Sequence, residues 1–361
     1  MSSWIEAAIA FVVMLVATPL LARLARRVGF GDDPRSAPER KLQSEAVPAV
    51  GGVALALALG AVVCARLWTA DPSLPEITDC DISARLQFHE GLLLAALAAA
   101  FGIGFLDDLL PRGLSPLAKL SGQIVAGILV SLGFGFARSL PSLTSLIERV
   151  GELDWLDWLA IPCGIAPMAF LTVLAQNLVN TWDNADGAAT SIGALGLTGA
   201  LVSLWYSADT LQAPALAALL VFLPFNLLLR RRGAPVAYLG DSGSHLLGVL
   251  LVAAGPVAWL ALWLPLVDLL RLSWVRLEAG SYPWVGDRRH LGHRLQARLG
   301  PVAVAAALTL MALPAVVGGA IRGPLSTLLG LLISTLFYLG ALAWTRDREG
   351  VLGDHAASHS S

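Results

Sequence analysis

The chain has 361 residues, of which 56% are hydrophobic and 14% are charged, with a net charge of −2 and a mean hydropathy of +0.71. Soluble domains carry about 25% charged residues, so this composition excludes an ordinary soluble protein and indicates one that crosses a membrane several times. Three scattered cysteines exclude a disulfide framework and a zinc site of the usual spacing.

Apolar runs of spanning length recur along the whole chain. A helix needs about 20 apolar residues to cross the hydrocarbon core. The first run has no basic stretch before it and no small-residue cleavage site after it, so it predicts a span and not a removed signal peptide. We therefore predict an all-α, polytopic membrane helix bundle with about eleven transmembrane helices. Their ranges are 4–24, 49–67, 91–106, 117–137, 158–176, 188–207, 212–229, 243–255, 257–273, 301–320 and 324–344.

One junction leaves this number open. Gly255-Pro256 separates the eighth run from the ninth, and a proline can kink one helix as well as end it. A single kinked helix here would give ten spans and would reverse the side of every later segment.

Basic residues predict the orientation. With the N-terminus outside, most Lys and Arg residues fall on the inner side, whereas the acid-rich loop from Asp71 to Glu90 falls outside. The positive-inside rule therefore predicts an outer N-terminus and a cytoplasmic C-terminus. Residues 1–345 form one transmembrane domain in this prediction, and 346–361 form a disordered cytoplasmic tail. Its inner loops are 25–48, 107–116, 177–187, 230–242 and 274–300.

The third predicted span ends in a pair of carboxylates. Asp107 and Asp108 follow the apolar stretch LAAAFGIGFL. Burying a carboxylate in hydrocarbon is costly, so those that are kept beside a span are functional candidates. Adjacent carboxylates favour a bound cation, or one of them holds a proton. A solvated turn before a proline is the alternative interpretation.

Four polar residues at spacings of three follow the fifth span. Asn177, Asn180, Asp183 and Asp186 occur in NLVNTWDNADG, which Gly187 closes. Residues three apart lie on one face of a helix, so the spacing predicts a polar stripe at the inner end of the span. A helix cap with a turn is the alternative, because Asn, Asp and Gly favour helix ends.

The segment YLGDSGSH places Asp241 between glycines, just before another span. Glycine lets the backbone approach a ligand closely, and amides at a helix start suit phosphate. Ser242 and Ser244 could equally be N-caps. All three acidic motifs fall on the predicted inner side, which suggests a divalent cation, Mg²⁺ or alternatively Mn²⁺, that holds a phosphorylated substrate.

Two inner loops supply basic residues. The loop SYPWVGDRRHLGHRLQ contains Arg288, Arg289, His290 and His293. Guanidinium groups bind phosphate, and histidine binds it or shuttles protons; a loop that only sets topology is the alternative. Lys41 in the first inner loop is a point-charge partner for phosphate.

Together these motifs resemble the polyprenyl-phosphate N-acetylhexosamine-1-phosphate transferases, a glycosyltransferase family (family 4) that includes the muramoyl-pentapeptide translocase. Five motifs occur in the family's order between Arg40 and Arg294: RK…P…GG, the Asp pair, NxxNxxDxxDG, GDSGS and DRxHxxH. The resemblance implies Mg²⁺-dependent transfer of a sugar 1-phosphate, typically an N-acetylhexosamine 1-phosphate, from a UDP-sugar to undecaprenyl phosphate, with release of UMP. It also implies a bacterial inner membrane and the start of cell-envelope polysaccharide synthesis. A homodimer suits such a bundle, and no nucleic acid is expected as a partner.

The resemblance also implies roles for single residues. Catalytic roles fall to Asp107, Asp108, Asp183, His290 and His293. Substrate contacts fall to Lys41, Asn177, Asn180, Asp186, Ser244, Arg288 and Arg289, and metal ligation to Asp241, Asp183 and Asp108.

The chain departs from the family pattern at three places. The His loop reads HLGH, with Gly292 where the family usually has a histidine, and Asn184 follows Asp183 where a glycine is usual. The Asp pair is followed by Leu-Leu-Pro. These departures leave the donor sugar open, although the DRxHxxH form is nearer to the GlcNAc-type members. A catalytically impaired member that binds the lipid carrier or a partner is one alternative, and an ion-coupled transporter, with carboxylates near the midplane, is another.

Overall fold

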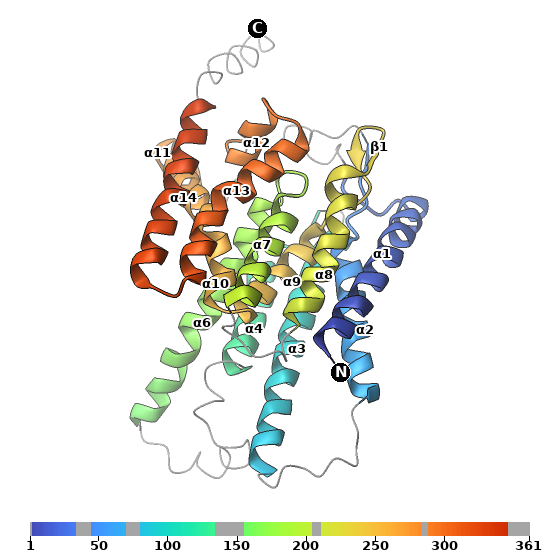
Figure 1. Ribbon diagram of the computed structural model, residues 1–361, viewed down its shortest axis with the longest axis vertical. Coiled ribbons are helices and arrows are strands. Elements are labelled where there is room, and N and C mark those ends of the chain that lie inside the picture. Colours follow the sequence, from blue (N-terminus) through green and yellow to red (C-terminus); the bar gives the residue numbers. More distant parts are fainter. Residues whose placement is uncertain are drawn as a thin grey trace.

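The computed structural model describes residues 2–33, 45–69, 80–110, 112–133, 155–203, 211–282 and 288–345, with the backbone alone for 80–89 and 155–164. These residues form a bundle of helices and one two-stranded hairpin (Figure 1). In chain order the elements are α1 (Ser3–Val28), α2 (Gly51–Thr69), α3 (Cys80–Leu109), α4 (Pro116–Ser131), α6 (Trp155–Trp182), α7 (Ala188–Ser203), α8 (Gln212–Leu223), the π-helix η3 (Pro224–Leu228), β1 (Arg230–Arg231), β2 (Ala234–Pro235), α9 (Gly240–Ala253), α10 (Pro256–Trp259), the 3₁₀-helix η4 (Leu260–Leu262), α11 (Trp263–Glu278), α12 (Leu291–Gln296), α13 (Pro301–Ala320) and α14 (Pro324–Trp344).

The helices confirm an all-α membrane protein. Each apolar range predicted from the sequence overlaps a helix or a run of consecutive helices. Among the described residues, six stretches are long and apolar enough to cross a membrane by length and composition: α1, α2, Glu90–Leu109 of α3, Pro256–Glu278, α13 and α14. Three shorter apolar stretches are Pro116–Ser131, Ala188–Ser203 and Gln212–Leu228. The number of spans and the orientation of the termini stay predictions, and the tail over 346–361 lies outside the described residues.

The chain breaks its helix at Gly255. Helix α9 ends at Ala253, Gly255 has a φ of 97° and α10 begins at Pro256. A positive φ of this size suits glycine, and proline suits the first helical position. The two apolar runs on either side are therefore separate helical segments, and α11 leads back toward the end of the bundle that holds the hairpin (Figure 1).

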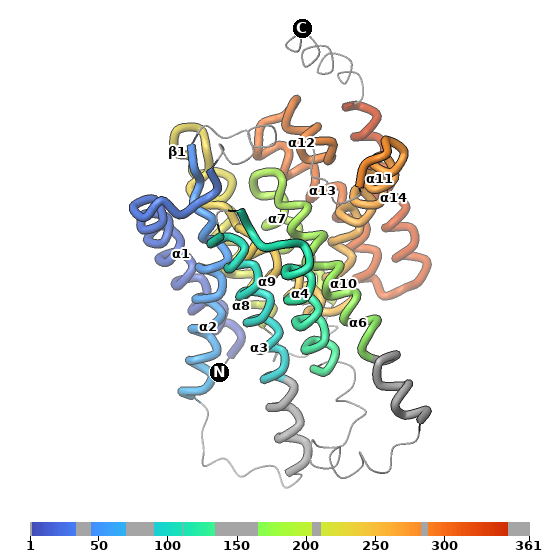
Figure 2. The backbone as a smooth tube through the Cα atoms, turned by 180° about the vertical axis from the view of Figure 1, so that it is seen from behind, coloured from blue at the N-terminus to red at the C-terminus, as the bar shows by residue number. Residues whose placement is uncertain are grey.

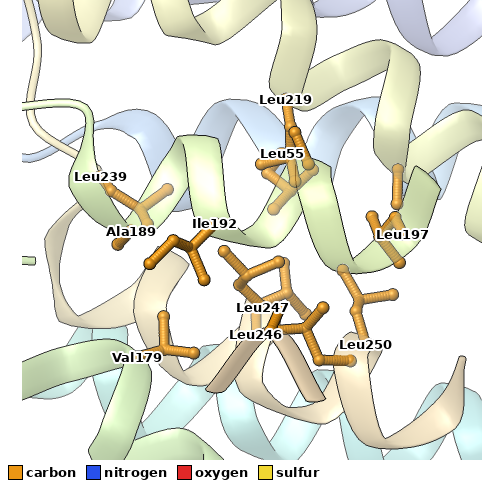
Figure 3. Close-up of a cluster of buried hydrophobic side chains, with 14 of the residues drawn as sticks. Leu55, Val179, Ala189, Ile192, Leu197, Leu219, Leu239, Leu246, Leu247 and Leu250 are labelled. Atoms are coloured by element: carbon orange, nitrogen blue, oxygen red, sulfur yellow. The ribbon is translucent and has the colours of Figure 1, made fainter. Parts of the chain in front are cut away.

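Helix α9 is the centre of the bundle. All its residues from Ser242 to Ala253 are buried, and it contacts α2, α3, α4, α6, α7 and α10. A helix that is apolar on every side has to be enclosed by others. Figure 3 shows leucines of α9 among side chains of the surrounding helices, namely Leu55, Val179, Ile192, Leu197, Leu219, Leu246, Leu247 and Leu250.

The outer helices keep large apolar side chains exposed. Leu20 of α1 is 54% exposed and Leu328 of α14 is 64% exposed, and both belong to a larger set of such residues. An apolar surface of this extent is unusual in a soluble monomer, so it fits contact with lipid.

Backbone contacts join two distant loops at the hairpin end of the bundle, the end opposite the start of α1 (Figure 2). Tyr238 N donates to Pro48 O at 2.9 Å, and Gly51 N donates to Tyr238 O at 2.9 Å. The buried Asn226 accepts from Gly187 N at 3.0 Å and donates to Ala237 O at 3.2 Å. These contacts fix the start of α9 beside the first inner loop and beside the turn that follows α6.

Candidate active site

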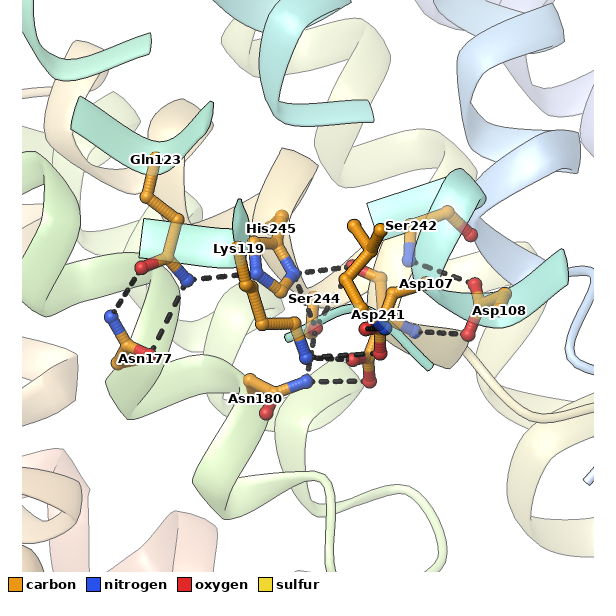
Figure 4. Close-up of polar contacts among 11 residues, drawn as sticks. Asp107, Asp108, Lys119, Gln123, Asn177, Asn180, Asp241, Ser242, Ser244 and His245 are labelled. Carbon is orange, nitrogen blue, oxygen red and sulfur yellow. Dashed lines mark hydrogen bonds and ion pairs between the residues drawn. The ribbon is translucent and has the colours of Figure 1, made fainter. Parts of the chain in front are cut away.

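Polar residues from four helix ends meet in one cluster (Figure 4). They come from the last turn of α3, the first turns of α4, the last turns of α6 and the first turn of α9, and these helices contact one another. The acidic motifs that the sequence placed far apart therefore lie side by side. The residues brought together are Asp107, Asp108, Lys119, Gln123, Asn177, Asn180, Asp241, Ser244 and His245.

Lys119 lies between two carboxylates. Its Nζ donates to Asp107 Oδ2 at 3.0 Å and forms a second ion pair with Asp241 Oδ2. Asp107 Oδ1 accepts from Leu114 N at 2.7 Å. The two carboxylates would repel each other without the shared ammonium group. The three charged side chains are 16–26% exposed, so a ligand can reach them.

Asp108 points away from this ion pair, toward the start of α9. Its Oδ1 accepts from Asp241 N and its Oδ2 from Ser242 N, each at 2.9 Å. The first amides of a helix have no partner within the helix, and a carboxylate there also offsets the positive end of the helix dipole. The amides of Asp241 and Ser242, which the sequence suggested for phosphate binding, therefore donate to Asp108 instead. Neither Ser242 nor Ser244 is the N-cap of α9.

Asn180 holds the Asp241 side chain from the other side. Its Nδ2 donates to Asp241 Oδ1 at 2.7 Å and to Ser244 Oγ at 3.1 Å. Ser244 is fully buried, and its hydroxyl donates to Asp241 O at 3.1 Å. Asn180 and Ser244 therefore fix the position of the carboxylate.

A buried amide and imidazole chain lies beneath Asp241. Asn177 Nδ2 donates to Gln123 Oε1 at 2.9 Å, and Gln123 Nε2 lies 2.9 Å from His245 Nε2. His245 Nδ1 lies 2.6 Å from Asp241 O. A carbonyl oxygen only accepts, so Nδ1 carries the proton, and Nε2 accepts from Gln123. The chain thus supports the first turn of α9.

Asp183 and Asp186 lie in a turn, because α6 ends at Trp182. The predicted helical stripe is correct for Asn177 and Asn180 and wrong for these two residues. Asp186 Oδ2 accepts from Arg230 Nη1 at 2.6 Å, which ties the turn to β1.

The Asp183 carboxyl stands among other negative charges. Burial raises the pKa of this carboxyl well above its usual value, and the charges of Asp241 and Asp186 raise the pKa further. Among the described residues its side chain has no hydrogen-bond or ion-pair partner. A cation bound here would relieve the repulsion.

The His loop is held by α11. His290 Nδ1 lies 2.8 Å from Asp268 Oδ2, and Arg289 O accepts from Arg271 Nη2 at 2.7 Å. The His290 and His293 rings meet edge to face, with centroids 6.5 Å apart.

The structure describes one of the two remaining predicted residues. Arg288 lies at the start of the described part of the loop, next to the anchored Arg289. Lys41 lies outside the described residues.

Comparison with known proteins decides the family. Residues 91–258 match the family described as Glycosyl transferase family 4, a range that contains the Asp pair, Lys119 and Asp241. A phospho-N-acetylmuramoyl-pentapeptide-transferase of Mycobacterium avium (strain 104) is 31% identical over 273 residues, which cover 68% of this chain and 73% of the relative. The chain belongs to glycosyl transferase family 4.

Two further family members match over similar lengths. A decaprenyl-phosphate N-acetylglucosaminephosphotransferase of Mycobacterium tuberculosis is 29% identical over 326 residues, 79% of this chain and 74% of the relative. A phospho-N-acetylmuramoyl-pentapeptide-transferase of Saccharopolyspora erythraea is 29% identical over 286 residues, 70% of this chain and 75% of the relative. The resemblance to polyprenyl-phosphate hexosamine-1-phosphate transferases is therefore confirmed, and both kinds of relative match to a similar extent.

Two of the three departures from the family motifs, Gly292 and Asn184, contact each other. A Cβ at Gly292 would lie 2.4 Å from Asn184 Oδ1 and 3.3 Å from Ala185 Cβ, so α12 packs directly on the turn after α6. Asn184 fills the space that a larger residue at position 292 would need. The glycine in the His loop is thus matched to the asparagine in the acidic motif.

Replacing Gly292 with alanine is expected to cost about 1 kcal/mol of stability, because Asn184 must move and lose its 2.9 Å hydrogen bond to Thr181 O. In an Asn184→Ala background that cost should largely disappear, a coupling that a double-mutant cycle isolates. Thermal unfolding of the purified protein measures it. Gly300→Ala, where a Cβ meets nothing within 4 Å, is the control; additive losses from the two changes would contradict the contact.

The acidic residues fit a magnesium ion held partly by substrate. Among the described residues, no group of three or more His, Cys, Asp or Glu side chains could hold a metal by itself. Mg²⁺ typically uses one or two carboxylates together with phosphate oxygens and waters. Asp183 supplies such a carboxylate, and Asp241 would supply a second one if the cation took the place of the Lys119 ammonium group at its Oδ2. Both oxygens of Asp108 instead accept backbone amides at the start of α9.

Four residues of the site were missed from the sequence. Lys119, Gln123 and Asp268 are polar residues inside predicted spans, and His245 closes the motif YLGDSGSH. Their signal was available, because a lone ionisable residue in a span is a functional candidate. Their partners could not be read from spacing, since each pairs with a different helix.

Proposed function

We propose that the protein transfers an N-acetylhexosamine 1-phosphate from a UDP-sugar to undecaprenyl phosphate at the cytoplasmic face of a bacterial inner membrane, releasing UMP. The product, a polyprenyl diphosphate sugar, would start cell-envelope polysaccharide synthesis. Family membership supports this reaction class.

One observation carries the proposal: Asp107, Lys119 and Asp241 form a partly exposed ion-pair cluster at helix ends, and the Asp183 carboxyl lies near Asp241. Two anionic phosphates have to meet in this reaction, and catalysis of phosphoryl transfer rests mainly on positioning and charge stabilisation. A site at the end of the bundle is open to a soluble nucleotide sugar and to a lipid headgroup. Carboxylates at helix ends also disfavour an ion-coupled transporter, whose sites lie near the midplane.

In the proposed reaction, an oxygen of the lipid phosphate attacks the sugar-bearing phosphorus of the donor. The new P–O bond forms as the bond from that phosphorus to the UMP oxygen breaks. A phosphate monoester is already largely ionised at neutral pH, with a second pKa of about 6, so Asp107 would orient the lipid phosphate or take its remaining proton. Lys119, Lys41 and the loop from Arg288 to His293 would bind phosphate oxygens.

Asn180 and Ser244 would keep Asp241 in place, and Asn177 would do so through Gln123 and His245. Asp241 and Asp183 would hold Mg²⁺, which when bound would neutralise the negative charge of the diphosphate and of the leaving UMP.

The test is UMP release by the purified protein in detergent with undecaprenyl phosphate and Mg²⁺. The donor panel should contain UDP-GlcNAc, other UDP-N-acetylhexosamines and UDP-MurNAc-pentapeptide. We expect turnover with one donor, and its loss in EDTA and in Asp241→Asn. Glu278→Gln, the same chemical change on the exposed Glu278 at the end of α11, should behave as the unaltered protein.

Two results would contradict the proposal. No UMP from folded protein that still binds undecaprenyl phosphate would favour a catalytically impaired family member. Full turnover by Asp241→Asn would remove Asp241 from the reaction.

A further inference from the structure

A second polar cluster joins α11, α14 and the His loop, and its one carboxylate, Asp268, lies outside the motifs that define the family resemblance. Asp268 is 1% exposed. Its Oδ1 accepts from Tyr338 Oη at 2.7 Å and from Arg271 Nη2 at 2.9 Å, and its Oδ2 lies 2.8 Å from His290 Nδ1. Every oxygen of this buried carboxylate is therefore occupied.

Burying these charged groups costs free energy of desolvation. A buried ion pair often contributes little net stability, because desolvation offsets the attraction between the charges. An apolar contact between α11 and α14 would hold the two helices together at least as well. This cost indicates that the cluster has a role beyond packing. Asp268 contacts His290 of a predicted active-site loop, so we expect that role in the active site.

The contacts orient the loop at two consecutive residues. Arg271 Nη2 donates to Arg289 O at 2.7 Å, and Arg271 Nε donates to Tyr338 Oη at 2.6 Å. The loop is thus held at its backbone by Arg271 and at the next side chain by Asp268. A third contact, the close approach of Gly292 to Asn184, packs α12 on the acidic turn.

The hydrogen bond to Asp268 also fixes the chemistry of His290. An ionised carboxylate only accepts, so His290 Nδ1 must carry a proton. The other ring nitrogen, Nε2, has no hydrogen-bond partner among the described residues and is the atom left for substrate. A carboxylate that holds a histidine in this way sets both the ring orientation and the tautomer.

We propose that Asp268 is a positioning residue that holds His290 with Nε2 directed at the phosphates of the donor, and that Arg271 and Tyr338 keep Asp268 ionised and in place. The inference deepens the proposed function and rests on it for its kinetic test. Asp268 acts through His290 and touches no substrate.

The kinetic test uses Asp268→Asn, His290→Asn and the double variant, with UMP release as the readout. Loss of a partner that orients a functional histidine costs about 10- to 100-fold in activity, so we expect a fall of that size in kcat with KM changed by less than about threefold. In the His290→Asn background, Asp268→Asn should have no further effect, because residues that act as one unit are not additive. An equal loss in both backgrounds would mean that Asp268 only joins the helices, and would overturn the proposal.

Thr335→Val is the matched control. Thr335 Oγ1 accepts from Trp263 Nε1 at 2.9 Å, so this change also removes one side-chain hydrogen bond between α11 and α14, away from His290. Turnover should stay at the level of the unaltered protein. A loss equal to that of Asp268→Asn would attribute the effect to helix contact and count against the proposal.

A second test does not depend on turnover. Nitrogen-15 NMR of histidine-labelled protein distinguishes protonated from unprotonated ring nitrogens, and the six histidines allow His290 to be assigned by difference with His290→Asn. We expect a proton on Nδ1 of His290 in the unaltered protein and its redistribution in Asp268→Asn. An unprotonated Nδ1 in the unaltered protein would overturn the proposal even if Asp268→Asn does not fold. A protein without transferase activity that gives the expected NMR result would overturn the proposed function alone.

Discussion

Replacing Lys119 with methionine is expected to lower turnover by about 100- to 1,000-fold, the usual cost of removing one preorganised electrostatic contact. Lys119 is the positive charge shared by Asp107 and Asp241. Methionine keeps much of the side-chain length and removes the charge, so the two carboxylates would face each other and repel the incoming phosphates.

Stability should fall as well in Lys119→Met. Breaking a fully buried ion pair costs about 3–5 kcal/mol, and the cost here should be smaller because Asp107 and Asp241 are 16% and 26% exposed. UMP release at saturating substrates measures turnover, and thermal unfolding measures stability. Lys119→Arg should recover part of the activity because it restores the charge.

Ser121→Ala is the matched control on the same helix, since the exposed Ser121 hydroxyl donates to Ala118 O of its own helix at 2.9 Å. A competing interpretation is that Lys119 only fills the place of the metal when no metal is bound. That interpretation requires Lys119→Met to keep its turnover and to need less Mg²⁺ for half-maximal activity. This result would contradict the role in catalysis.

The sequence predicted the helices well, because apolar runs and their breaks are local features. The break at Gly255-Pro256 is an example, since a glycine before a proline is readable as an end and a start. The convergence of the acidic motifs also followed from the chain, because all of them stand at helix ends on one predicted side.

The pairing of those residues could not be read from spacing. Asp107 and Asp108 look alike in sequence, yet neighbouring residues of a helix point in different directions. Asp107 faces Lys119 of α4, whereas Asp108 faces the amides at the start of α9. Only the packing of α3 against both helices shows that Asp107 faces the ion-pair cluster and that Asp108 fixes the start of α9.

The partner of His290 could not be read from the sequence for the same reason. His290 is recognisable from its motif, but Asp268 lies 22 residues earlier in an apolar helix. Its pairing depends on how α11 and α14 pack, and single residues without a repeat carry no such information.

Replacing Gly104 with alanine is expected to lower turnover by about 100-fold, because a shift of about 1 Å in a reacting group can have that effect. A Cβ at Gly104 would lie 2.3 Å from Asp241 O and 2.6 Å from Ser242 Cα. These are backbone atoms, so no side-chain rotation can relieve the overlap. The start of α9 must move away from α3, and Asp241 must move with it.

Gly102 of the same helix provides the matched control, since a Cβ there meets nothing within 4 Å. Gly102→Ala should stabilise the protein by about 0.5–1 kcal/mol, because alanine is the better helix former, whereas Gly104→Ala should destabilise it by about 1–3 kcal/mol through overpacking. If Gly104 is kept for the close approach to Asp241, thermal unfolding should give opposite signs for the two variants, and UMP release should fall only in Gly104→Ala. If both changes stabilise the protein and leave turnover intact, α9 can move without loss of function. The close contact between α3 and α9 would then not be needed to position Asp241.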